Sequence, residues 1–129
     1  MLNELAKEVL AINDANGWGD KPHEVGTTLM LIVSELAEAM EADRKDRYCN
    51  VPKDKEWTVF DPRTFHRGNI HFKETFEENI KDKFEDEISD TIIRCLDLCA
   101  RRGIDIDFHV RAKMEYNKTR GHHHGGKAY

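Results

Sequence analysis

The sequence predicts an all-α fold, a bundle of four to five helices in one domain, on three observations. Residues 28–45 carry apolar side chains at helical intervals along one face. Residues 73–101 repeat that period over a longer run. The one candidate strand, residues 56–60, has no evident partner strand. A chain of 129 residues has room for a single hydrophobic core, so these helices are expected to share it across residues 1–129.

The first two helices are bounded by turn residues. The first is predicted over residues 2–16, where Gly17 and Gly19 supply the backbone freedom of a turn. The central helix is predicted from about residue 23 to residue 46. The residues of the central helix expected to face the core are Leu29, Ile32, Val33, Leu36, Ala37 and Met40.

A long connection separates the two long helices. Residues of about 48–72 contain prolines, a glycine and several aromatic side chains. A connection of this length in a compact domain is usually a functional loop or a disordered one, and its aromatic residues argue against full disorder. We expect an ordered excursion that covers part of the bundle.

The second half of the chain is predicted to hold two further helices. The first runs over residues 73–101, and Gly103 is suited to cap its C-terminus. Its predicted core stripe is Phe76, Ile80, Phe84, Ile88, Thr91, Ile92, Cys95 and Cys99. Asp105 or Asp107 can cap a last helix that reaches about residue 118. In that helix Phe108, Val110 and Met114 are expected to face inward.

Composition excludes several classes of function. The net charge of −5 argues against general nucleic-acid binding. No run approaches the ~18 apolar residues of a membrane span, and the N-terminal residues mix charges with apolar side chains, unlike a signal peptide. Three cysteines without framework spacing indicate reduced thiols. We therefore expect a cytoplasmic protein with no membrane partner.

Two acidic pairs lie on the two long helices. Glu35 and Glu38 are three residues apart on one helix, and Glu87 and Asp90 repeat that spacing on the other. Four carboxylates that converge inside a bundle repel one another unless a cation lies between them. Oxygen-only ligation favours Mg²⁺, with Mn²⁺ as a substitute, over iron or zinc. Arg94, on the same flank as the second pair, is expected to form an ion pair with Asp97.

Two other interpretations of the acidic pairs stay open. Carboxylates at this spacing are common on helix surfaces, where they serve only solubility. A di-iron carboxylate bundle also builds its site from facing helices, but that class needs Glu-x-x-His on two of them, and neither pair here is followed by histidine at that offset.

The motifs resemble those of a known family. Residues 34–45, SELAEAMEADRK, and 86–94, DEISDTIIR, resemble the paired motifs of MazG-like all-α nucleoside triphosphate pyrophosphohydrolases. The basic tail is similar to the Lys…Asn-x-x-Arg…Lys ending of small members, and its matching residues are Lys113, Asn117, Arg120 and Lys127. The excursion lengthens the spacing between the two acidic motifs beyond the family's compact pattern.

This resemblance implies hydrolysis of a nucleoside triphosphate to monophosphate and pyrophosphate with Mg²⁺, in a homodimer or homotetramer. It makes Glu35, Glu38, Glu87 and Asp90 the metal ligands, with Glu38 and Glu35 the candidates to activate water. The four tail residues would bind the phosphates. The substrate stays open among dUTP-like, dCTP-like, broad-specificity and phosphoribosyl-ATP activities.

One further alternative concerns function, and one further residue is a candidate for contact with the substrate. The chain can be a nucleotide-binding or interaction module that has the fold but no turnover. Trp18, between the two glycines that follow the first helix, is a candidate to stack on a nucleobase, although a tryptophan in such a turn more often packs against the end of a bundle.

Overall fold

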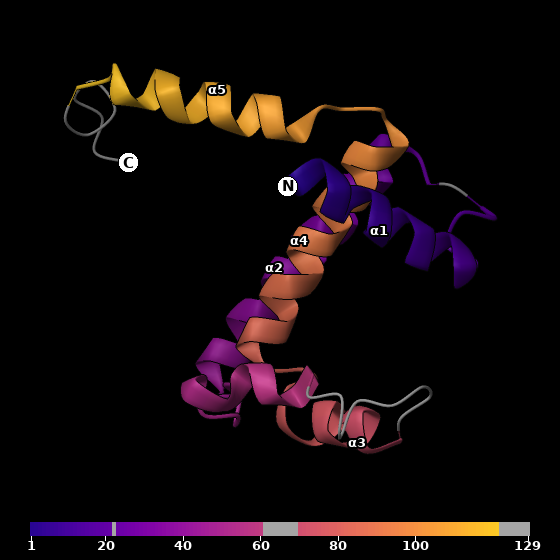
Figure 1. Cartoon of the computed structure of the whole chain (residues 1–129), viewed down its shortest axis with the longest axis vertical. Coiled ribbons are helices and arrows are strands. Elements are labelled where there is room, and N and C mark those ends of the chain that lie inside the picture. The colour runs from indigo at the N-terminus through magenta and orange to yellow at the C-terminus, as the bar shows by residue number, and fades with distance from the viewer. Residues whose placement is uncertain (22, 61–69, 122–129) are drawn as a thin grey trace. The chain divides into compact units, whose positions relative to one another are not determined.

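The structure, a computed structural model, describes residues 1–21, 23–60 and 70–121. These residues form five α-helices and one 3₁₀ segment, and contain no strand (Figure 1). In order, they are α1 (Leu2–Ala15), α2 (Val25–Arg44), η1 (Lys53–Phe60), α3 (Ile70–Asn79), α4 (Phe84–Arg101) and α5 (Ile106–Lys118). The prediction of an all-α protein with four to five helices is confirmed at this level. In the described part of the chain, no helix is long and apolar enough to cross a membrane.

The chain divides into two compact units. Unit 1 is Met1–His23 with Cys95–Tyr129, and unit 2 is Glu24–Arg94. Helix α4 supplies its first part to unit 2 and its last part to unit 1. Each unit is described by itself.

Unit 1 is built on α1, the end of α4, and α5. Its core consists of Ala6, Val9 and Leu96, against which Leu2, Ala100 and Ile106 pack. Gly103 adopts a φ of +64°, the left-handed conformation that glycine accepts readily, so α4 ends where the sequence predicted. Asp105 caps α5 through a hydrogen bond from the backbone N–H of Phe108, at 3.0 Å, also as predicted.

A reciprocal cap joins the starts of α1 and α5. The carboxylate of Asp107 accepts hydrogen bonds from the backbone N–H groups of Leu2 and Asn3, each at 3.0 Å. In return, Asn3 Oδ1 accepts from the N–H of Ile106 at 2.9 Å. Each helix therefore satisfies backbone donors at the other helix's N-terminus.

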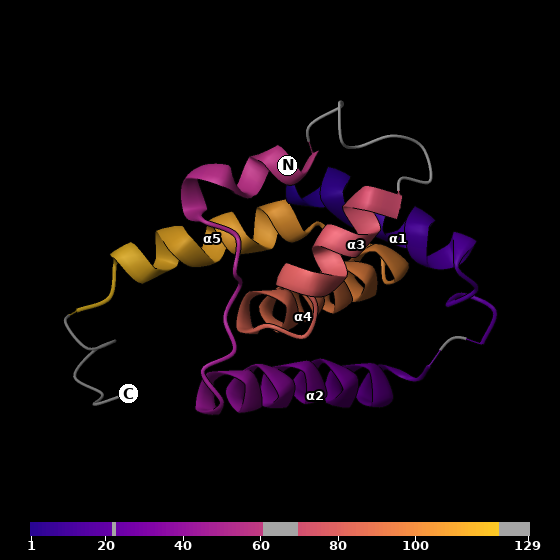
Figure 2. The same ribbon diagram turned by 90° about the horizontal axis from the view of Figure 1, so that it is seen from below.

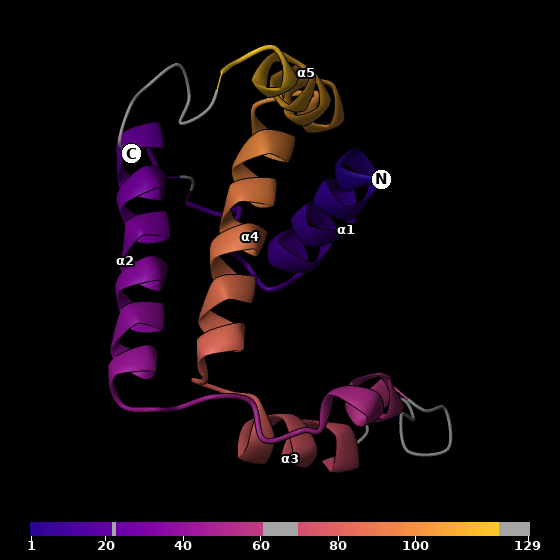
Figure 3. The same cartoon turned by 90° about the vertical axis from the view of Figure 1, so that its left-hand side faces the viewer.

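Unit 2 is built on α2 and the first part of α4, which run antiparallel (Figure 3). The backbone N–H of Phe84 donates to the carbonyl of Arg47 at 2.9 Å, and the rings of Tyr48 and Phe84 lie 5.4 Å apart. These contacts tie the start of α4 to the chain just beyond the end of α2. Segment η1 contacts α3, which lies beside it (Figure 2).

The single helix expected over residues 73–101 is two helices, and that prediction was wrong. Helix α3 ends at Asn79, and α4 begins at Phe84. Between them Asp82 has a φ of +59°, and its N–H donates to the Asp86 carboxylate at 2.9 Å. Aspartate tolerates the left-handed conformation better than most residues, so this turn forms without glycine or proline.

The predicted core faces also need correction. On α2 the buried residues are Ile32, Glu35, Ala39 and Ala42. The residues expected to be buried that are instead about half exposed are Leu29, Val33, Leu36 and Met40. The small alanines occupy the buried side, where a second helix can approach closely, and the large side chains form an apolar ridge beside it. Phe108, Val110 and Met114 on α5, and Ile92 on α4, are exposed as well.

Candidate metal centre

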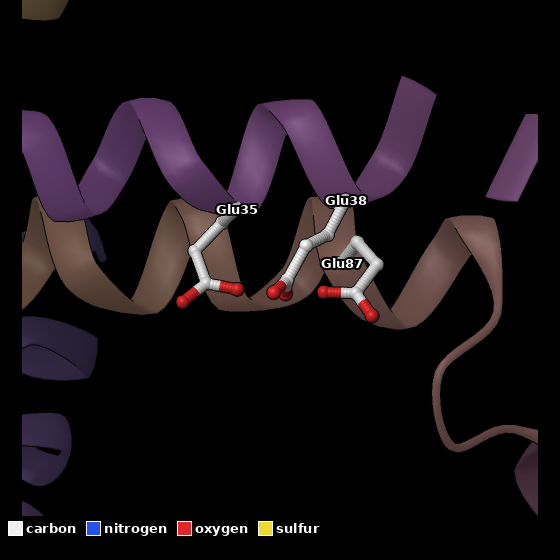
Figure 4. Close-up of side chains that lie close together, drawn as sticks. All are labelled: Glu35, Glu38 and Glu87. Atoms are coloured by element: carbon white, nitrogen blue, oxygen red, sulfur yellow. The ribbon is translucent and has the colours of Figure 1, made fainter. Parts of the chain in front are cut away.

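Three of the four predicted ligands come together in unit 2. Oxygen atoms of Glu35 and Glu38 on α2 and of Glu87 on α4 lie within 4.8 Å of one another. Their carboxylates point into the same space between the two helices (Figure 4). Only acids are in this group, so any ion held here would have oxygen ligands alone.

Burial separates the members of this group. Glu35 and Glu87 are each only 7% exposed, whereas Glu38 is exposed. A carboxylate is almost never buried so deeply without a partner that neutralises it. The arrangement places two buried acids beneath one acid that solvent reaches.

Electrostatics shift the proton equilibrium of Glu87 strongly. The pKa of Glu87 is raised to about 7, and burial is the largest cause. The charge of Glu38 adds to this, as does a hydrogen bond in which the protonated Glu87 donates to Glu38. Glu87 therefore holds a proton where an isolated glutamate would have lost it, and a cation at this position would displace that proton.

Asp90, the fourth predicted ligand, lies one turn further along α4 and is not part of the three-acid group. Burial raises its pKa, and the charges of Asp86 and Glu35 add to the effect. Asp90 is half-buried and within the electrostatic reach of the group.

Arg94 has a different partner from the predicted one. Its Nε donates to Glu35 Oε1 at 2.6 Å, in an ion pair whose side chains are 27% and 10% exposed. Asp97 instead receives hydrogen bonds from Asn13 at 2.9 Å and from Arg101 at 2.7 Å. The predicted Arg94–Asp97 pair was therefore wrong. Arg94 pairs with a residue of α2, and Asp97 pairs with a residue of α1 and with one that lies one turn further along α4.

A second acidic group was not predicted. It consists of Asp82, Asp86 and Glu87, so it shares Glu87 with the first group. Burial raises the pKa of Asp86, and the charge of Asp82 adds to that. The sequence signal was the run of acids that opens α4, which can be read from the residues alone, but the turn that brings Asp82 back onto Asp86 cannot.

The residues predicted to bind phosphate belong to unit 1. Lys113 and Asn117 lie on α5, and Arg120 follows it, with the cations of Lys113 and Arg120 5.1 Å and 5.9 Å from the Tyr116 ring centroid. These distances are typical of cation–π contacts. Lys127, the fourth, lies outside the described residues.

Trp18 also belongs to unit 1 and is 56% exposed. It lines an open cavity of about 430 Å³ with Asn16, Gly17, Asp20, Lys21 and His23. That volume lies toward the small end of the range for ligand pockets. More than half of the Trp18 side chain is therefore open to solvent.

Comparison with protein-family models, curated proteins and solved structures finds no match for this chain.

Proposed function

We propose that the protein hydrolyses a nucleoside triphosphate at the α–β phosphoanhydride, giving nucleoside monophosphate and pyrophosphate, with Mg²⁺ as cofactor. The observation that carries the proposal is the meeting of Glu35, Glu38 and Glu87 between two antiparallel helices, with two of the three carboxylates buried. The sequence motifs around these residues and the basic tail support the same reaction.

The donor set fits a hard divalent ion. Mg²⁺ takes oxygen ligands, commonly one or two carboxylates together with waters and phosphate oxygens. Glu35, Glu38 and Glu87 would hold it, with Asp90 one turn away on the same helix. When bound, the metal neutralises phosphate charge and lowers the pKa of a coordinated water. Mn²⁺ is expected to substitute.

The chain's own residues have distinct roles in this proposal. Glu38, the solvent-accessible member of the group, would orient and deprotonate the attacking water. Lys113, Asn117, Arg120 and Lys127 would bind the phosphates by charge and hydrogen bonding, and Trp18 would stack on the base. Nucleotide-pool cleansing in the cytoplasm is the role such a reaction would serve.

The test is pyrophosphate release from a panel of ribo-, deoxy- and modified nucleoside triphosphates with Mg²⁺. Glu38→Gln and Asp90→Asn should each lower turnover by about 100-fold or more, because general-base catalysis and metal positioning are lost. Glu41→Gln is the matched control, since Glu41 lies on the same helix but pairs with Lys45 at 2.8 Å. It should keep wild-type turnover.

The alternative is a nucleotide-binding module without turnover. It would be favoured if wild-type protein binds a nucleotide only in the presence of Mg²⁺ and releases no pyrophosphate from any substrate. If the wild-type protein neither binds nor hydrolyses any nucleotide of the panel, both functions are ruled out.

Self-association through α2 is part of the proposal. The ridge of Leu29, Val33, Leu36 and Met40 has spacings of four, three and four residues, the interval of a coiled-coil seam. Each member is 47–50% exposed. The ridge carries no charge, so a second copy can meet it without like-charge repulsion, as in a homodimer or homotetramer.

Sedimentation would test the assembly. Leu36→Lys should shift the protein to monomer, because a charge would be buried against an apolar partner. Met114→Lys, a substitution of an exposed apolar residue on α5, is the control and should leave the mass unchanged. A wild-type monomer at all concentrations would contradict the interface.

A further inference from the structure

Arg94 places a cation against one acid of the candidate metal centre. It lies on α4 one turn beyond Asp90, and its Nε donates to Glu35 Oε1 at 2.6 Å. Charge-assisted hydrogen bonds of this length are among the stronger ones in proteins. Glu35 is buried, with 10% of its side chain exposed, so water competes little for that oxygen.

The other acids of the centre would push Glu35 away. Glu38 and Glu87 have carboxylate oxygens within 4.8 Å of it. Like charges at this separation repel, and the repulsion grows as the surroundings become less polar. A carboxylate held at one oxygen by arginine keeps its orientation against that repulsion, and it still has a second oxygen that can meet a metal.

We propose that Arg94 is a positioning residue for the metal centre: it holds Glu35 in the orientation in which that carboxylate meets the metal together with Glu38 and Glu87. This inference rests on the proposed function, because it concerns the same metal. Partners that orient a metal ligand in this way typically change metal affinity by about 10–100-fold when they are removed.

The chain contains a matched arginine for comparison. Arg101 has the same side-chain exposure as Arg94, 27%, and also forms short carboxylate pairs, to Asp97 at 2.7 Å and Asp14 at 2.8 Å. Neither Asp97 nor Asp14 belongs to either three-acid group of the described residues. Loss of Arg101 should therefore cost stability without affecting the metal.

The experiment measures Mn²⁺ binding to the full, metal-stripped chain. The electron paramagnetic resonance signal of the free ion reports how much Mn²⁺ stays unbound. Arg94→Met should weaken binding by about 10–100-fold. Arg94→Lys should fall between Arg94→Met and wild type, because an ammonium keeps the charge but lacks the planar guanidinium. Arg101→Met should bind as wild type does. Circular dichroism melts establish that each variant is folded at the temperature used.

Two results would overturn the inference. One is wild-type or tighter Mn²⁺ affinity in folded Arg94→Met, which would make the pair a structural contact or a competitor of the metal. The other is wild-type affinity in Arg94→Lys, since charge alone would then suffice. If Arg94→Met does not fold, the lysine variant decides between support and rejection.

The design separates this inference from the proposed function. If wild-type protein binds no Mn²⁺, the metal centre fails, and the role of Arg94 falls with it before any variant is compared. If wild-type protein binds Mn²⁺ but hydrolyses no nucleotide, the proposed reaction fails while the comparison of Arg94 and Arg101 still stands.

Discussion

Two sets of carboxylates, one in each unit, have opposite surroundings. In unit 1, hydrogen bonds from Asn3 and from backbone N–H groups hold the pKa of Asp105 and Asp107 below the usual range. In unit 2, burial and neighbouring acids raise the pKa of Asp86, Glu87 and Asp90. These carboxyl groups thus accept hydrogen bonds in unit 1, whereas those in unit 2 lie near other acids.

Under the proposed function, this difference separates acids that serve folding from acids that would hold a metal. A carboxylate that accepts hydrogen bonds at a helix N-terminus stabilises the native state as it stands. Buried acids that repel one another destabilise it until a cation arrives. Shifts of the second kind cluster at functional sites more often than elsewhere, which supports placing the chemistry in unit 2.

The largest effect is expected from exchanging one acid in each unit. Glu87→Gln removes a ligand and should weaken Mn²⁺ binding by more than about 100-fold, beyond the loss typical of an orienting partner. The same change should leave the metal-free melting temperature at pH 8 equal or higher, because one buried, repelled charge is gone. Calorimetric titration and thermal melts measure the two quantities.

Asp107→Asn in unit 1 is the reciprocal case. It weakens the acceptor for the N–H groups of Leu2 and Asn3 and should lower the melting temperature. Mn²⁺ affinity should stay as in wild type. If both substitutions changed stability alone, the distinction between the two kinds of acid would be lost.

The pH dependence of stability should also differ between the units. The pKa of Glu87 is raised from 4.5 to about 7 on folding, so between these values the native state keeps a proton that the unfolded state has released. Its stabilising contribution is full below pH 4.5, and it is lost as pH rises to about 7 in chelator-treated protein. Glu87→Gln should remove this decline.

Asp105 and Asp107 should affect the free energy of unfolding at the acidic end of the pH range. Their folded pKa values lie below the ordinary 3.8, so their contribution is present above that pH and is lost as pH falls through the folded values. Urea unfolding from pH 3 to pH 8, with and without Mn²⁺, measures both limbs. Metal-free stability that rises from pH 4.5 to 7 would contradict the assignment for Glu87.

The helices could be predicted from the sequence because nearby residues set their ends. Which faces are buried and which ion pairs form could not be predicted, because both depend on contacts with distant parts of the chain. Gly103 and Asp105 act on their own few residues, so the end of α4 and the start of α5 could be identified directly. On α2, Leu36 and Ala39 are both apolar, and only the proximity of α4 decides which of them is buried. Hydrophobicity alone cannot make that choice.

The same limit applies to the candidate site. The i, i+3 spacing put Glu35 beside Glu38 correctly, because that relation exists within one helix. The nearest sequence partner of Arg94 was Asp97, but its partner in the fold is Glu35, which lies 59 residues away. A long-range pair of this kind depends on how two helices are packed and leaves no periodic signal.

A smaller effect is expected from the reciprocal cap in unit 1. Asn3→Ala removes the acceptor for the N–H of Ile106 at 2.9 Å and the hydrogen bond to Asp105 at 2.8 Å. Loss of a capping side chain costs about 1 kcal/mol of unfolding free energy. Urea unfolding should show that loss, and Asn3→Asp should not recover it, since its carboxylate would face Asp105 in place of the amide donor.

The smallest expected effect comes from Gly19, in the turn after α1. A Cβ at this position would overlap with Asp14 Oδ1, so in Gly19→Ala the Asp14 side chain must rotate away and leave Arg101. The Asp14 side chain is 50% exposed, and exposed ion pairs contribute no more than about 1 kcal/mol. Urea unfolding should therefore show a loss at or below that size, with Mn²⁺ affinity unchanged. Asp14→Ala alone should give the same loss, and the double variant should cost no more than either single one. A clearly additive double variant would mean that Gly19 is needed for its backbone conformation and not for the space that Asp14 occupies.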